Sequence, residues 1–125
     1  MATVNLNLET FESTIKENQL VFVDYWAAWC GPCRVFAPIF EEVSEGNKDI
    51  VFAKVDTENQ QELAAMAGIQ SIPTLMIFKE EIVIFSQAGA LPKPALDELI
   101  AAAKALDMDE VRAQIEAEQA ANADK

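Results

Sequence analysis

The sequence predicts an α/β fold: a central mixed sheet of about five strands flanked by about four helices, plus a C-terminal helical extension. Apolar, β-branched stretches alternate along the chain with stretches whose apolar residues have helical spacing. The last two strand-like stretches are only three residues apart. A length of 125 residues with 51% hydrophobic side chains suits one core. We expect residues 1–106 to form one domain and residues 107–125 an acidic helical extension.

The first half of the chain is predicted to contain two strands and two helices. Residues 3–6 are expected to form an edge strand, and residues 7–17 have the apolar spacing of a helix. Residues 20–26 are almost continuously apolar, which predicts a buried strand. A helix is expected over residues 33–45, with a kink at Pro38 because proline removes a backbone hydrogen bond.

The middle of the chain adds one strand and one helix. Residues 50–55 read as a strand. Asp56 or Thr57 is a suitable cap for a helix over residues 58–67, and Gly68 stands where that helix should stop.

Two closely spaced strands and a helix complete the predicted domain. Residues 74–78 and 82–85 must pair antiparallel, because the three residues between them cannot form a crossover. That turn, residues 79–81, contains two glutamates where an Asn-Gly turn would be favourable. We therefore expect a different turn type or a small local energetic cost. A helix follows Pro92 and Pro94 and runs to about residue 106.

The last segment begins with Asp107, which starts a capping-box-like sequence. Met108, Val111 and Ile115 recur on one side, and the remaining residues are mostly Ala, Glu and Gln. We expect a solvated, partly frayed helix in preference to a docking element.

Composition excludes several kinds of function. The formal charge is −12, from 21 acidic and 9 basic residues, and the bases form no cluster. This argues against nucleic acid and against anionic membranes as partners. The chain has no His and only two Cys, so one copy cannot complete a four-ligand zinc site. No apolar run is long enough to span a membrane, and the first residues do not resemble a secretory signal, which predicts a cytoplasmic protein.

The two cysteines, Cys30 and Cys33, are three residues apart. A disulfide closing so short a loop adds little stability, so a redox role is the economical interpretation. Cys30 follows a predicted buried strand and opens a helix, whose unpaired N–H groups and dipole favour a thiolate. Cys33 lies near enough to attack a mixed disulfide formed by Cys30. Pro32 suits the first helical turn.

The sequence around these cysteines resembles the thioredoxin family. Trp-Cys-Gly-Pro-Cys at residues 29–33 matches the active-site sequence of the family completely. Further matches are spread over residues 2–106: Val-Asp-Tyr-Trp-Ala at 23–27, Ala-Pro at 37–38, Ala-Lys-Val-Asp at 53–56, Ile-Pro-Thr at 72–74 and Gly-Ala at 89–90. The resemblance implies a thioredoxin fold and a thiol-disulfide oxidoreductase that reduces disulfides in other proteins.

The resemblance also assigns catalytic roles. Cys30 would be the exposed attacking cysteine and Cys33 the buried resolving one, forming the redox-active disulfide with no bound cofactor. Asp24 resembles the buried acid that exchanges protons with Cys33, and burial in an apolar strand should raise its pKa. Lys54 matches the lysine beside that acid and would oppose the rise. Pro73 aligns with a proline that follows a cis peptide bond, although an Ile-Pro pair by itself predicts trans.

The same resemblance predicts a substrate surface around the disulfide. The backbone of Ile72 would pair with the client chain like an added strand. The predicted contact residues are Trp29, Gly31, Pro32, Ile72, Ala88, Gly89 and Ala90.

The expected partners are disulfide-containing client proteins and a thioredoxin reductase, and the protein is expected to be a monomer. The family suggests a flavin-containing, NADPH-dependent reductase, and the sequence does not distinguish this from a ferredoxin-dependent one. Two alternatives stay open. One is an oxidase or isomerase on the same fold, although such relatives usually carry His between the cysteines. The other is a binding or scaffold subunit in which the cysteines are not essential.

Overall fold

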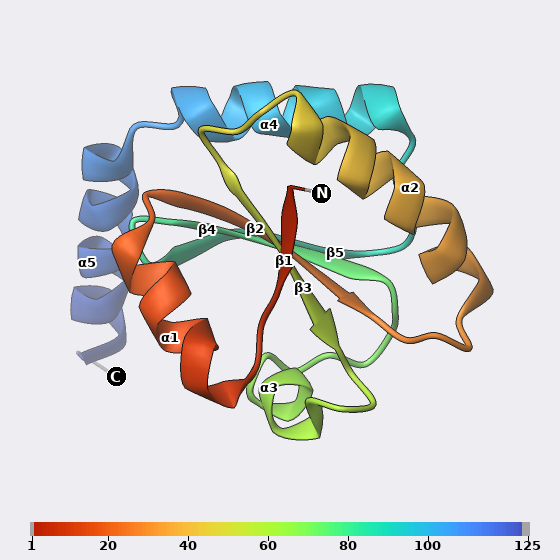
Figure 1. Cartoon of the computed structure of the whole chain (residues 1–125). Helices are drawn as coiled ribbons and strands as arrows, with labels where there is room; N and C mark the ends of the chain where they lie inside the picture. Colours follow the sequence, from red (N-terminus) through yellow and green to blue (C-terminus); the bar gives the residue numbers. More distant parts are fainter. Residues whose placement is uncertain (1, 124–125) are drawn as a thin grey trace.

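The computed structural model describes residues 2–123 as a five-stranded sheet with helices on both faces and one further helix at the C-terminal end (Figure 1). The strands are β1 (Thr3–Asn5), β2 (Leu20–Trp26), β3 (Val51–Asp56), β4 (Thr74–Lys79) and β5 (Ile82–Ala88). The helices are α1 (Leu8–Glu17), α2 (Gly31–Glu45), α3 (Gln61–Met66), α4 (Lys93–Ala105) and α5 (Met108–Ala123). These elements confirm the predicted α/β class and the predicted order of strands and helices.

The sheet is mixed and has the order β1-β3-β2-β4-β5. β3 pairs in parallel with β1 and β2, whereas β4 pairs antiparallel with β2 and β5. In the parallel pair of β2 and β3, Asp24 is opposite Lys54 and Trp26 is opposite Asp56. The two strands therefore end side by side at the same edge of the sheet.

Helices cover β2 on both sides, which explains why its sequence is apolar rather than alternating. α2 and α4 lie on one face of the sheet, and α1 and α3 lie on the other (Figure 1). The α2/α4 face buries Phe22, Phe36, Phe40, Phe52, Leu75 and Leu96 among others. The α1/α3 face buries Ile15, Val21, Val23, Tyr25, Val55 and Leu63 among others.

Local side-chain chemistry sets where the helices begin and end. The Asn7 Oδ1 atom accepts the N–H groups of Glu9 and Thr10, each at 2.9 Å, and so caps α1. α3 begins three residues later than predicted, because the Asp56 carboxylate accepts the N–H of Glu58 at 3.0 Å and holds a turn there. The chain leaves α3 through Gly68 at φ 68°, a left-handed conformation that favours glycine. α2 includes Pro38 within its length, and the kink expected there stays a prediction.

The turn between β4 and β5 has positive φ at both glutamates, 50° at Glu80 and 71° at Glu81. The turn therefore has the predicted local energetic cost rather than a turn type that avoids positive φ. This cost is about 1 kcal/mol or more for each residue in this conformation. Two contacts hold the turn in place. The Glu80 N–H donates to the Gln19 carbonyl at 2.8 Å, and the Glu80 carboxylate pairs with Arg112 at 2.7 Å.

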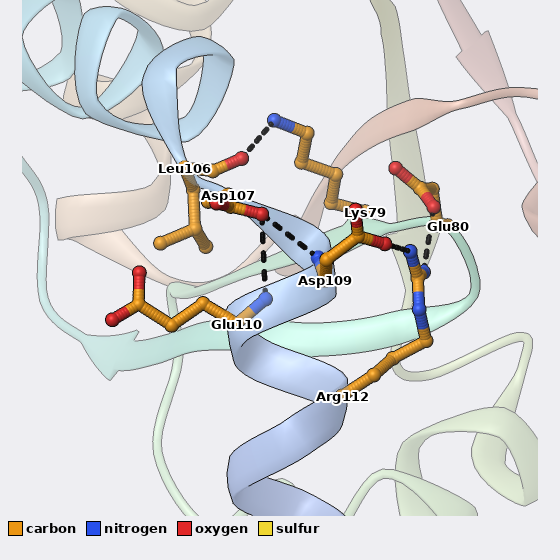
Figure 2. A network of polar contacts seen from close by, with 7 residues as sticks. All are labelled: Lys79, Glu80, Leu106, Asp107, Asp109, Glu110 and Arg112. Carbon is orange, nitrogen blue, oxygen red and sulfur yellow. Dashed lines mark hydrogen bonds and ion pairs between the residues drawn. The ribbon is translucent and has the colours of Figure 1, made fainter.

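Lys79, the last residue of β4, is buried and closes the C-terminal end of α4. Its Nζ atom donates to the carbonyl oxygens of Ala103 at 2.7 Å, Lys104 at 3.2 Å and Leu106 at 2.9 Å. Figure 2 shows the bond to Leu106. The last carbonyls of a helix have no partner within it, and a cation there also opposes the negative end of the helix dipole.

We expect Lys79→Met to lower the free energy of unfolding by about 2 kcal/mol, because three carbonyls lose their common donor. Urea unfolding followed by circular dichroism measures the change. The control is Lys104→Met, which removes only an exposed ion pair with Asp49 and should change stability by less than about 1 kcal/mol. Equal effects of the two variants would contradict this role for Lys79.

The first half of α5 is docked, which corrects the expectation of a solvated helix. Met108 is 4% exposed, and Val111 and Ile115 are half-buried. Arg112 bonds both Glu80 and Asp109 at 2.7 Å (Figure 2), joining the helix to the β4–β5 turn. Apolar contact and the Arg112 bridge between two carboxylates together hold this half, whereas residues 116–123 are exposed as expected.

Deletion of residues 107–125 should lower the melting temperature by roughly 5 to 10 °C, because it removes the buried Met108 side chain and the Arg112 bridge. A shorter deletion that keeps residues 1–115 should retain most of the stability. Thermal melts of the three proteins test this. A melting temperature unchanged by the longer deletion would show that the docked half contributes nothing.

Candidate active site

The disulfide Cys30–Cys33 lies where β2 leads into α2. Cys30 is the N-cap residue of α2, with φ −88° and ψ 115°, and the Cys33 N–H donates to the Cys30 Sγ atom at 3.2 Å. The Cα atoms of the two cysteines are 5.2 Å apart. The sulfur that is predicted to react therefore accepts one of the unpaired N–H groups of the helix terminus, where negative charge is stabilised.

The expected exposure of Cys30 is wrong for this oxidised state. Cys30 is 4% exposed and Cys33 is 2% exposed. The disulfide turns the Cys30 sulfur toward Cys33, and Ala27, Trp26 and Ile72 pack around the pair.

Asp24 is fully buried in the central strand. Within residues 2–123, neither carboxylate oxygen has a hydrogen-bond partner. Burial raises the pKa of Asp24 from 3.8 to about 7, and the charge of Lys54 opposes part of that rise. The predicted direction of the pKa shift is therefore present, together with the opposing lysine.

Lys54 extends from β3 over the indole of Trp26, with Nζ 4.9 Å from the ring centroid. The Trp26 Nε1 atom is buried and, in the part of the chain that the structure describes, also lacks a hydrogen-bond partner. Trp26 thus packs against the disulfide cluster and also contacts Lys54.

A second loop brings Ile72 and Pro73 to the disulfide. The Ile72–Pro73 peptide bond is cis, as the resemblance implied and the dipeptide alone did not. The Ile72 carbonyl oxygen is 3.7 Å from the Cys30 Sγ atom. The Pro73 carbonyl accepts the N–H of Gly89 at 2.8 Å, and Gly89 has φ 109°, which other residues rarely adopt.

The predicted surface residues differ in exposure. Trp29 is 65% exposed, Ile72 is half-buried and Pro73 is buried. The exposed small or rigid members are Gly31, Pro32, Ala88, Gly89 and Ala90. The contacts given above connect Ile72 to Cys30, and Gly89 to Pro73.

Two side chains that the sequence reasoning did not select hold the edges of this site. The Trp29 Nε1–H donates to the Glu58 carboxylate at 2.6 Å, and the Arg34 Nε–H donates to the Ala28 carbonyl at 3.0 Å. A signal for Glu58 was available. Trp29 and Glu58 each follow the end of a strand, and a helix separates these two strands in the sequence. Strands connected in this way pair in parallel, so both ends meet at one edge of the sheet.

Comparison with known proteins identifies the family. The thioredoxin family model matches residues 2–102. The chain belongs to the thioredoxin family. A Streptomyces coelicolor protein described as thioredoxin 2 is 52% identical over 119 residues, covering 95% of this chain and 89% of that protein. Thioredoxin of Bacillus subtilis is 39% identical over 101 residues, covering 80% of this chain and 96% of that protein.

Solved thioredoxins share the fold. Plasmodium falciparum thioredoxin superposes with a TM-score of 0.73 at 36% identity, over 79% of this chain and 96% of that one. A mutant thioredoxin from Halobacterium salinarum gives a TM-score of 0.76 at 28% identity, over 84% of this chain and 92% of that one. The Streptomyces match spans 119 of 125 residues, so it must include much of α5, whereas the family model ends at residue 102.

Family membership and the Cys30–Cys33 disulfide together establish dithiol/disulfide exchange as the activity, so the chain is a thiol-disulfide oxidoreductase. Residues 2–123 contain no group of three or more potential metal ligands. None of the helices described between those residues is long and apolar enough to cross a membrane.

The raised pKa of Asp24 predicts a pH-dependent loss of stability. The unfolded carboxyl ionises near 3.8 and the folded one near 7, so the folded state resists ionisation between these values. Stability due to this group is full below about pH 4 and falls as the pH rises toward 7. Asp24→Asn should therefore be more stable than the wild type at about pH 8. The difference in free energy of unfolding between the variant and the wild type should be about 4 kcal/mol larger at about pH 8 than at about pH 4.

Urea unfolding of the oxidised proteins at both pH values measures this difference. The control is Asp97→Asn, which removes an exposed carboxylate on α4 and should show no comparable pH-dependent gain. A difference between wild type and Asp24→Asn that does not change with pH would contradict the buried-acid interpretation.

Proposed function

We propose that this protein is a cytoplasmic protein-disulfide reductase whose Cys30–Cys33 pair is returned to the dithiol by a thioredoxin reductase. The main support for this proposal is the position of the Cys30 sulfur at the N-terminus of α2, where the Cys33 N–H donates to it at 3.2 Å. That arrangement favours a thiolate on Cys30 once the disulfide is opened.

The first step is an attack by the Cys30 thiolate on one sulfur of a client disulfide. The client S–S bond breaks, a mixed disulfide forms between Cys30 and the client, and the other client sulfur leaves as a thiolate. Its place at the helix terminus makes Cys30 the attacking residue of the pair.

In the second step Cys33 resolves the mixed disulfide. Its thiol proton passes to Asp24, directly or through water, and the Cys33 thiolate then attacks the Cys30 sulfur. The client leaves with two thiols, and the protein leaves as the Cys30–Cys33 disulfide, having given up two electrons. A pKa of about 7 supports this role for Asp24, because such a carboxyl is still partly ionised near neutrality. Lys54 limits the rise of that pKa.

The client docks beside the disulfide. The Ile72 backbone pairs with an extended client chain, and the 3.7 Å distance between the Ile72 carbonyl oxygen and the Cys30 sulfur supports this role. Pro73 fixes the direction of that backbone. The contact surface is completed by Trp29, Gly31, Pro32, Ala88, Gly89 and Ala90, whose small or flat side chains allow close approach.

The electrons are supplied by a flavin-containing reductase that uses NADPH, and a ferredoxin-dependent reductase is the alternative outcome. Gly31 and Pro32 between the cysteines support the reductase direction over an oxidase. A reducing compartment such as the cytoplasm fits this direction, because an oxidising one would keep the pair as a disulfide.

Reduction of insulin disulfides with NADPH and a thioredoxin reductase tests the proposal. We expect catalytic amounts of the protein to accelerate insulin precipitation and NADPH consumption. No acceleration with either NADPH-linked or ferredoxin-linked reductase, although the protein is folded, would reject the reductase assignment.

Single cysteine variants test the order of the two steps. Cys33→Ser should abolish turnover and accumulate a mixed disulfide between Cys30 and the client, because the resolving sulfur is gone. Cys30→Ser should abolish turnover without accumulating one. Mass spectrometry of the non-reduced reaction identifies the adduct. A client adduct on Cys33 of the Cys30→Ser protein, formed as fast as that on Cys30, would reverse the roles.

A further inference from the structure

An exposed indole beside the disulfide is bonded to an acidic side chain. Trp29 is 65% exposed, and its Nε1–H donates to the Glu58 carboxylate at 2.6 Å, between residues 29 positions apart in sequence. An indole has a single hydrogen-bond donor, and here that donor is used. The ring therefore presents apolar surface next to Cys30, with a carboxylate at its rim.

The loop after β3 holds Glu58 in position from its backbone. Asp56 accepts the N–H of Glu58 at 3.0 Å, and its other carboxylate oxygen accepts the side-chain amide of Asn59 at 3.0 Å. The Asp56 carboxylate therefore fixes the backbone of Glu58, which gives the Glu58 charge a defined position.

The same loop is bonded to the strand that leads to the disulfide. The N–H and hydroxyl of Thr57 both donate to the Trp26 carbonyl, at 2.8 Å and 3.0 Å. Trp26 is three residues before Trp29, and Thr57 directly precedes Glu58. The two loops are therefore joined by the Thr57–Trp26 bonds as well as by the bond between Trp29 and Glu58.

Two side chains of opposite charge bond the loop that leads to the disulfide. Glu58 accepts the Trp29 indole N–H, and Arg34 on α2 donates to the Ala28 carbonyl. A client bound across this surface meets a negative charge on the β3–α3 side. An exposed pair between Glu58 and a positive charge on the client would contribute modestly to affinity but strongly influence the encounter rate.

We propose that Glu58 is a specificity-determining residue, which holds the Trp29 indole and favours clients that carry Lys or Arg beside the disulfide. The inference rests on the proposed function, since it requires clients to contact Trp29. The chain as a whole is also acidic, at −12, so the test must separate Glu58 from the overall field.

Two probe peptides, each with one intramolecular disulfide, differ only in whether Lys or Glu flanks that disulfide. The protein is first reduced with dithiothreitol and freed of it, and the second-order rate of peptide reduction is measured. We expect the wild-type protein to reduce the lysine peptide faster than the glutamate peptide. Glu58→Gln should lower this rate ratio by about two- to fivefold, because it keeps the acceptor and removes the charge.

Glu62→Gln is the matched control, since it removes the same charge from an exposed position on α3. It should leave the rate ratio unchanged. About 0.5 M sodium chloride should lower the wild-type ratio toward that of Glu58→Gln. A ratio that is unchanged in Glu58→Gln, or equally lowered in Glu62→Gln, would overturn the proposal.

A third variant separates positioning from charge. Glu58→Leu removes the acceptor as well, so it should slow reduction of both peptides below the rates of Glu58→Gln and shift the tryptophan emission. Identical rates and emission in the two variants would show that the bond to the indole has no positioning role. If the wild-type protein reduces neither peptide, the proposed function fails rather than this inference.

Discussion

The parallel pairing of β2 with β3 is the constraint on which the site depends. It aligns Asp24 with Lys54 inside the sheet and Trp26 with Asp56 where the strands end. Because both strands end at one edge, the loop with the disulfide and the loop with Glu58 begin side by side. A slip of one residue would turn every side chain of β2 to the opposite face, and the Asp24 carboxyl would move from the face that α2 covers to the face that α1 covers.

That constraint also places a destabilising group in the core. A carboxyl with a pKa near 7 opposes folding at neutral pH by about 4 kcal/mol, a large fraction of the 5–15 kcal/mol that a domain typically has. The surrounding strand is buried on both faces, so apolar contact offsets the loss. The same desolvation that costs stability gives Asp24 a pKa suited to accepting a thiol proton.

Patterns of apolar residues predicted the sheet and the helices because burial periodicity is a local property of the chain. Features set by tertiary contacts escaped prediction. The β4–β5 turn accepts positive φ at Glu80 because Arg112, 32 residues away, pairs with its carboxylate. The delayed start of α3 follows from one Asp56 bond. The catalytic pair was evident from its spacing, whereas Glu58 required knowing which strands end together.

The two ends of β4 differ in how well their polar groups are hydrogen-bonded. At one end, next to Pro73, buried polar atoms of Asp24 and Trp26 have no hydrogen-bond partner among the residues that the structure describes. At the other end, Lys79 satisfies three helix carbonyls and Arg112 bonds two carboxylates. Unpaired buried polar groups lower the stability of the fold, so stabilising contacts elsewhere must offset this loss. The docked half of α5 adds contacts at the satisfied end, where it strengthens the hairpin and leaves the disulfide surface open to clients.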